Sequence, residues 1–135
     1  MRMTRISQKL IYPELSYKIT GILFKVHNEL GRYCKERQYQ DALEQELKAN
    51  GFQFEREKKC PITLEVGGNQ VDFCIENKIL LDCKAKSIIT KEDFYQMLRY
   101  LKAEKIKLGF IVNFRNKYLK PKRILNSGID YNACE

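Results

Sequence analysis

The feature that most constrains the fold of this chain is a change in the spacing of its apolar residues. From Tyr12 to Leu30 these residues recur at steps of three and four, which predicts an amphipathic helix that Gly31 ends. A second helical pattern runs from Tyr39 to Leu47, and Gly51 follows it as a stop signal. The two segments predict a bent pair of helices.

Beyond Gly51 the spacing changes to two, which is typical of strands. Apolar and polar residues alternate at 52–54 and again at 62–66, before a Gly67-Gly68 turn. Val71 to Ile75 and Ile79 to Ala85 are rich in β-branched and apolar residues, and the short polar segment 76–78 separates them. These two runs predict a β-hairpin.

Helical spacing returns after Thr90, a predicted N-cap that acidic residues follow in the first turn. The core-facing residues of this helix are predicted to be Phe94, Met97, Leu98 and Leu101. Leu108 to Phe114 is a mostly apolar run, as expected of an interior strand. The predicted order is therefore α-α-β-β-β-β-α-β, that of an α/β (α+β) fold.

Length and composition set the class of protein. The chain has 135 residues, the size of a single domain, and we expect its core between about residues 12 and 124, with a frayed C-terminal tail. The net charge of +8 favours a polyanionic partner such as nucleic acid. A basic cluster near the C-terminus fits either a solvated surface or a phosphate-binding strip: Arg115, Lys117, Lys120, Lys122 and Arg123.

Other classes find no support in the sequence. No apolar run is long enough to span a bilayer and no signal peptide is evident, so we expect a cytoplasmic protein without a membrane partner. The five cysteines show no CxxC spacing and indicate neither a disulfide framework nor a zinc site. The lone His27 lies in a helical segment and is expected to be a surface or core histidine rather than a catalytic one.

The chemistry concentrates in the strand Ile79 to Ala85. A period of two places Leu80, Asp82 and Lys84 on one face of this strand. A loop over residues 76–78 pairs Ile75 with Ile79 and sets Asp72 opposite Asp82, with Cβ atoms roughly 5 Å apart. Two carboxylates so placed repel each other unless a cation lies between them, and oxygen ligands suit Mg²⁺ or Mn²⁺.

Two alternatives stay open for these residues. A two-residue loop would put Asp72 and Asp82 on opposite faces, so the metal hypothesis depends on the hairpin register. Lys84 can stabilise negative charge on a phosphate in the transition state, but a plain salt bridge between Asp82 and Lys84 explains the same spacing.

The larger pattern resembles the PD-(D/E)XK nuclease superfamily, and more narrowly the small bacterial GxxExxY proteins. The matching stretches run from about Tyr12 to Ile124: 27–31, Glu36 with Tyr39, Val71-Asp72, Asp82-Cys83-Lys84, 96–101 and 108–114. The resemblance implies a central mixed four- to five-stranded sheet flanked by helices. The second glycine expected before Glu36 is replaced, so the bend between the helices is expected to differ, and Asp82 stands where the narrower family more often has Glu.

Roles for individual residues also follow from the resemblance. It implies Asp72, Asp82, the carbonyl of Cys83 and Glu36 as metal ligands, Lys84 as the catalytic ammonium, and a Gln96-x-x-x-Tyr100 element that orients the lysine or contacts the nucleic-acid backbone. Glu36 can instead be an exposed acid that favours a helix start. Gln96 and Tyr100 can also belong to an ordinary amphipathic helix, on the face away from its core-facing residues.

Three hypotheses follow from the sequence. The first is a Mg²⁺- or Mn²⁺-dependent nuclease that hydrolyses DNA or RNA, and the second is an inactive nucleic-acid-binding module on the same fold. The third is an interaction protein in which Asp82 and Lys84 form only a structural pair. The oligomeric state, monomer or homodimer, is left open.

Overall fold

The computed structural model describes residues 11–60 and 70–126. Four of the eight elements in these ranges are α2 (Pro13–Leu30), α3 (Glu36–Ala49), β1 (Phe54–Lys59) and β2 (Gln70–Ile75). The other four are β3 (Ile79–Lys84), α4 (Lys91–Glu104), β4 (Leu108–Asn113) and β5 (Lys122–Leu125). Within the described residues, no helix has the length and apolar composition needed to cross a membrane.

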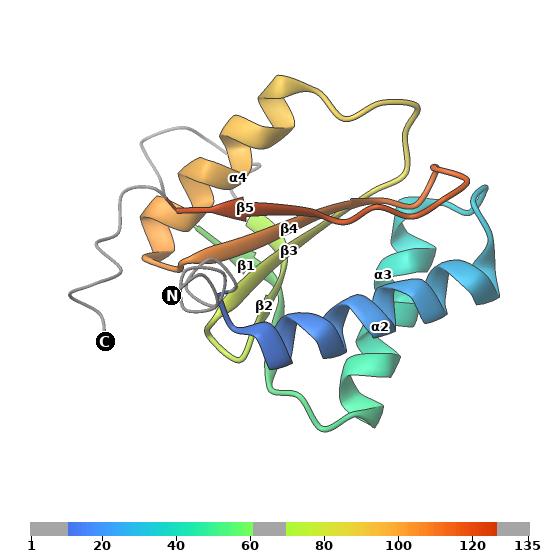
Figure 1. Cartoon of the computed structure of the whole chain (residues 1–135), viewed down its shortest axis with the longest axis horizontal. Helices are drawn as coiled ribbons and strands as arrows, with labels where there is room; N and C mark the ends of the chain where they lie inside the picture. The colour runs from blue at the N-terminus through green and yellow to red at the C-terminus, as the bar shows by residue number, and fades with distance from the viewer. Residues whose placement is uncertain (1–10, 61–69, 127–135) are drawn as a thin grey trace, which may run out of the picture.

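The strands form one mixed five-stranded sheet in the order β1-β2-β3-β4-β5. Neighbouring strands are antiparallel except β3 and β4, which run parallel, as a crossover through α4 requires. Helix α4 covers one face of the sheet, and α2 and α3 cover the other (Figure 1). This α+β architecture, with a mixed sheet flanked by helices, confirms the predicted fold class.

The helix boundaries follow the predicted signals. Gly31 ends α2 with φ of 79°, a left-handed conformation that glycine adopts without strain. Thr90 caps α4: its hydroxyl accepts from the amide of Asp93, whose carboxylate accepts from the Thr90 amide. This capping box fixes where α4 begins.

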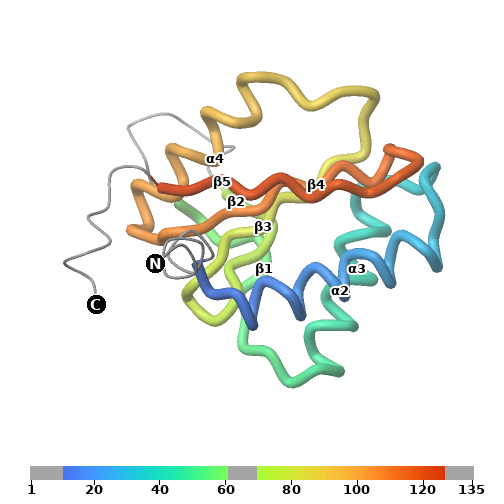
Figure 2. Tube along the Cα trace, viewed as in Figure 1, coloured from blue at the N-terminus to red at the C-terminus, as the bar shows by residue number. Residues whose placement is uncertain are grey.

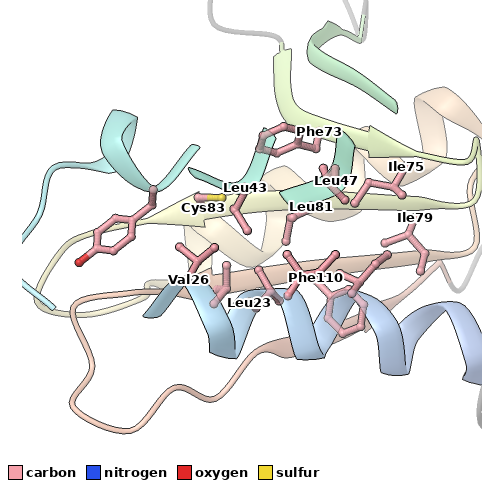
Figure 3. Close-up of a cluster of buried hydrophobic side chains, with 14 of the residues drawn as sticks. Leu23, Val26, Leu43, Leu47, Phe73, Ile75, Ile79, Leu81, Cys83 and Phe110 are labelled. Carbon is pink, nitrogen blue, oxygen red and sulfur yellow. The ribbon is translucent and has the colours of Figure 1, made fainter. Parts of the chain in front are cut away.

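The larger core lies between the sheet and the helices α2 and α3. It includes Leu23, Val26, Leu43, Leu47, Phe73, Ile75, Ile79, Leu81, Cys83 and Phe110 (Figure 3). The predicted spacing of Tyr39, Leu43 and Leu47 is confirmed, since all three are fully buried. Cys83 is also fully buried in this core.

A second core lies under α4 and depends on Gly109. A Cβ at this position would lie 2.6 Å from the sulfur of Met97, so only glycine lets α4 pack this close to β4. Met97, Tyr100 and Leu101 are the buried residues of α4, whereas Phe94 and Leu98 are only partly buried.

The described residues follow α-α-β-β-β-α-β-β. Strand β5, in the basic C-terminal segment, was not predicted. Its charged residues conceal the strand pattern, and only Ile124 of β5 is buried. The strand predicted at 62–66 lies outside the described residues.

Candidate active site

The β2-β3 hairpin has the register on which the metal hypothesis depends. Ile75 pairs with Ile79 and Phe73 with Leu81, so the loop has three residues and Asp72 is the next position opposite Asp82. The ladder ends at Phe73, and the Asp72 carboxylate accepts a hydrogen bond from the Cys83 amide at 2.7 Å. The side chain of Asp72 thus bonds to β3 just beyond the last backbone pair.

The two carboxylates interact strongly. Asp82 is buried, with 7% of its surface exposed, and Asp72 is half-buried. Burial, together with the charge of Asp82, raises the pKa of Asp72 to about 7, although the Cys83 amide acts in the opposite direction. A cation bound between Asp72 and Asp82 would relieve the repulsion between their carboxylates.

Lys84 completes the predicted trio. Its Nζ lies 2.8 Å from Asp82 Oδ2 and 4.0 Å from Asp93 Oδ1. Burial disfavours the charged form of Lys84, but the carboxylates of Asp82, Asp93 and Glu36 together outweigh burial and raise the pKa of the ammonium. The salt bridge offered as an alternative is therefore formed. It lies among the carboxylates of Glu36, Asp72, Asp82 and Asp93, which we call the acidic cluster.

Glu36, the first residue of α3, reaches the same cluster from the opposite layer. Burial of its carboxylate raises its pKa, and the next influences are Lys84, which lowers it, and Asp82, which raises it. The carboxylate therefore lies near both residues, although Glu36 as a whole is exposed. Glu36 is also an acidic residue in the first turn of α3, so its charge favours the helix start as well.

Tyr39 fixes the bend that places Glu36. Its hydroxyl donates to the carbonyl of Gly31 and accepts from the amide of Cys34 at 3.2 Å. Its ring stacks on Phe114, with 4.2 Å between centroids and 7° between planes. Because Glu36 lies one helical turn before Tyr39, these contacts hold the start of α3 against the end of β4.

The sequence assigned no role in the site to three residues that lie near it: Asn113, Lys86 and Asp93. Asn113 is buried, its amide donates to the Lys86 carbonyl at 2.7 Å, and its carbonyl accepts from the amides of Lys86 and Arg115. Lys86 forms an ion pair of 2.6 Å with Asp93. The sequence did contain a signal for two of them. Asp93 has capping-box spacing from Thr90, and Lys86 lies two positions beyond Lys84.

The prediction that Tyr100 lies on a face of α4 away from the core is wrong. Tyr100 is only 2% exposed and packs in the core under α4 with Met97 and Leu101. Burial and then the charge of Asp82 raise the pKa of Tyr100, so its ring lies beside the acidic cluster. Gln96, on the other hand, is half-buried.

The donor set suits a cation bound by few protein ligands. Among residues 11–60 and 70–126, no group of three or more His, Cys, Asp or Glu side chains has the arrangement of a metal site. Mg²⁺ usually keeps several waters and needs only one or two carboxylates. Asp72 and Asp82 meet that requirement, while the Cys83 side chain is buried in the opposite core, which leaves only its carbonyl as a donor.

Several polar residues around the site have structural partners. His27 bonds through Nε2 to the Asn116 carbonyl at 2.9 Å, as expected of a non-catalytic histidine. Arg115 donates to the carbonyls of Arg32 and Ala85, and Arg123 donates to Ser16. Two arginines of the basic C-terminal cluster therefore hold the fold together.

Three connections between elements lie together at one end of the sheet. In Figure 2 the α2-α3 connection, the β3-α4 loop and the β4-β5 hairpin end lie on one side of the molecule, and the contacts of Arg115 and Asn113 join them.

A comparison with protein families gives one match. The model of the PD-(D/E)XK nuclease superfamily matches residues 13–124, a range that includes every residue of the acidic cluster. No curated protein and no solved structure matches the chain.

Proposed function

Because this chain belongs to the PD-(D/E)XK nuclease superfamily, we propose that it hydrolyses phosphodiester bonds of DNA or RNA with the help of Mg²⁺ or Mn²⁺. Nucleases of this superfamily generally use divalent metal ions. Within the superfamily we assign it to the GxxExxY proteins, on the order of the motif residues from Glu36 and Tyr39 to Asn113 and Phe114.

One observation supports this proposal above the others. Asp72, Asp82 and Lys84 come together at the end of the β2-β3 ladder, and Glu36 approaches them from α3. A buried acidic pair with a raised carboxyl pKa is costly for stability, and such clusters are typical of functional sites. The cluster has the chemistry of a phosphodiester-cleaving centre: hard oxygen donors next to an ammonium.

Each residue has a distinct proposed role. Asp72 and Asp82 would hold the metal ion, with the Cys83 carbonyl and Glu36 as further donors, directly or through water. When bound, such an ion activates a water and polarises the phosphate. Lys84 stabilises the negative charge that develops on the phosphate oxygens, and Asp82 keeps its ammonium oriented.

Helix α4 provides the remaining parts. Gln96 orients Lys84 or contacts the nucleic-acid backbone. The buried position of Tyr100 and the influence of Asp82 on its pKa support a role that differs from the predicted nucleic-acid contact, as part of the wall of the site.

The test is cleavage of labelled single- and double-stranded DNA and RNA with Mn²⁺ or Mg²⁺. We expect Lys84→Ala to lower the rate by roughly 10²- to 10³-fold, the loss typical of a transition-state charge stabiliser. Lys78→Ala is the matched control, because Lys78 is exposed at the opposite end of the same hairpin. Equal rates for the two variants would contradict the assigned role of Lys84.

A folded wild-type protein that binds nucleic acid without cleaving it would instead indicate an inactive binding module. Since binding by basic residues releases counterions, that binding should weaken steeply as salt is raised.

A further inference from the structure

A second feature lies beside the acidic cluster, on the α4 side of the sheet. It is a cavity of about 340 Å³ between the β3-α4 loop and the chain entering β5. Volumes of roughly 300–1,000 Å³ are usual for sites that hold small ligands. Its lining comes from 87–89, Ile111, Asn113, Asn116 and 120–122.

Strand register relates this cavity to the proposed reaction centre. Asp82 pairs with Ile111 across β3 and β4, and Ile111 pairs with Lys122 across β4 and β5. Directly paired residues point to the same face of a sheet, so these three form one row. Two strand spacings separate Asp82 from Lys122, a distance of roughly 10 Å between backbones.

The lining combines apolar surface with positive charge. Ile88 is 67% exposed, although it is a large apolar residue, and Ile89 and Pro121 add further apolar surface. Lys120 and Lys122 are both exposed, and Lys122 Nζ lies 5.7 Å from the centre of the Phe94 ring of α4. An apolar wall beside two ammonium groups suits a ligand with an apolar, planar part and a negative charge.

Hydrogen bonds join the two segments that form the cavity. The side chain of Asn113 bonds to the backbone of Lys86 on one side and to the amide of Arg115 on the other. It therefore joins the β3-α4 loop to the β4-β5 connection, the two segments that form the cavity. A preformed site avoids much of the entropic cost of ordering its loops when a ligand binds.

We propose that this cavity is a subsite for a nucleotide of the nucleic-acid strand, next to the phosphodiester bond that the acidic cluster cleaves. The base lies against Ile88 and Pro121, and a flanking phosphate lies on Lys120 and Lys122. This inference rests on the proposed function for its substrate class.

The charge of the chain favours this ligand over an apolar partner. The net charge is +8, and the subsite adds two lysines, of which Lys122 lies two strand spacings from Asp82. A protein partner with an apolar patch would gain nothing from Lys120 and Lys122. A nucleotide uses both the lysines and the apolar wall.

The experiment measures binding and not cleavage, so that it separates this inference from the proposed function. Fluorescence anisotropy of a labelled single-stranded oligonucleotide is followed in EDTA, over a range of salt concentrations. We expect Lys120→Gln with Lys122→Gln to weaken binding on the order of tenfold and to reduce the salt slope by about 0.7, the change expected when one phosphate contact is lost. The matched control is Lys18→Gln with Lys102→Gln, which removes the same charge from exposed positions of α2 and α4.

A second variant tests the base-binding wall. Ile88→Ser should weaken binding about fivefold, the loss expected if a base covers roughly 40 Å² of apolar surface. An oligonucleotide of the same length without bases should bind wild type and Ile88→Ser equally, because only the base contacts Ile88.

The outcomes separate cleanly. Binding that depends on both subsite variants supports the subsite even if the wild type never cleaves, in which case only the proposed function fails. Cleavage by a protein whose binding responds equally to the lysine variant and its control overturns the subsite and leaves the nuclease standing. Absence of oligonucleotide binding by the folded wild type at low salt also overturns it, as does an effect of Ile88→Ser only on binding to another protein.

Discussion

The two faces of strand β3 have opposite compositions, although the same six residues form both. Ile79, Leu81 and Cys83 point into the core with α2 and α3, and each is at most 1% exposed. On the other face Leu80 packs under α4, but Asp82 and Lys84 follow it in the acidic cluster. One face therefore packs in the core, while the other places charged groups beside Asp72.

This difference explains how the chain tolerates a costly site. Burying a charge beside a like charge opposes folding, and the raised pKa of Asp72 reflects that cost. The apolar face of β3 and the parallel pairing with β4 offset this cost, because they hold the strand in place whether or not a cation neutralises the carboxylates. Rigid support of this kind is what a catalytic constellation needs.

The largest expected effect is on the apolar face. Leu81→Ala should lower the free energy of unfolding by about 2–5 kcal/mol, because it leaves a cavity in the core among α2, α3 and the sheet. Urea denaturation measures this loss, and Leu125→Ala is the control, since Leu125 is 41% exposed on β5. Similar losses for the two variants would mean that the apolar face of β3 is not the main support of the site.

The next effect is on the charged face. Asp82→Asn should reduce cleavage roughly 10²- to 10³-fold. The melting temperature of the metal-free protein should stay nearly unchanged, because the variant loses the ion pair with Lys84 but also loses the repulsion from Asp72. Wild type should be stabilised by Mn²⁺, by about 2.7 kcal/mol at 100 times the dissociation constant, and the variant should lose this response.

Asp41→Asn is the control for that experiment, since Asp41 is exposed and pairs with Arg56 outside the acidic cluster. A Mn²⁺ response that survives in Asp82→Asn would contradict the assignment of Asp82 as a metal ligand.

A smaller effect should appear in the pH dependence of stability without metal. Burial and Asp82 raise the pKa of Asp72 from 3.8 to about 7, so the folded protein binds a proton that the unfolded chain has lost between these values. The contribution of Asp72 is therefore present at low pH and is lost as pH rises from about 4 to about 7.

The measurement is the free energy of unfolding in EDTA at several pH values between 4 and 8, for wild type and Asp72→Asn. Glu36 also has a raised pKa and gives the same sign in both proteins, so the difference between them reports on Asp72. Parallel pH profiles would show that Asp72 titrates normally in the folded protein.

Local signals in the sequence were sufficient for much of the fold and for the central trio. The three-residue loop at 76–78 set the register that brings Asp72 opposite Asp82, and the Thr90 cap fixed the start of α4. Both depend on residues close together in the chain. The bend between α2 and α3 was harder to predict, because the Tyr39-Phe114 stack that braces it joins distant segments.

The two errors of prediction, for Tyr100 and for β5, also arise from contacts between segments that are distant in the chain. Tyr100 is amphipathic, and the spacing of α4 allows a buried stripe through either Phe94 and Leu98 or Met97 and Tyr100. The close packing of Met97 on Gly109 selects the second stripe. Strand β5 was missed because its pairing with β4 is a tertiary contact, while its own residues are mostly charged and exposed.

The smallest expected effect tests the brace between the layers. Tyr39→Phe keeps the stack on Phe114 but removes the hydroxyl that bonds to Gly31 and Cys34, and it should lower the free energy of unfolding by about 1 kcal/mol. Tyr33→Phe is the control, since Tyr33 is 76% exposed. Because the bend also places Glu36, Tyr39→Phe should reduce metal-dependent cleavage by more than the control does. A loss of stability without any loss of cleavage would indicate that Glu36 reaches the acidic cluster without help from this bend.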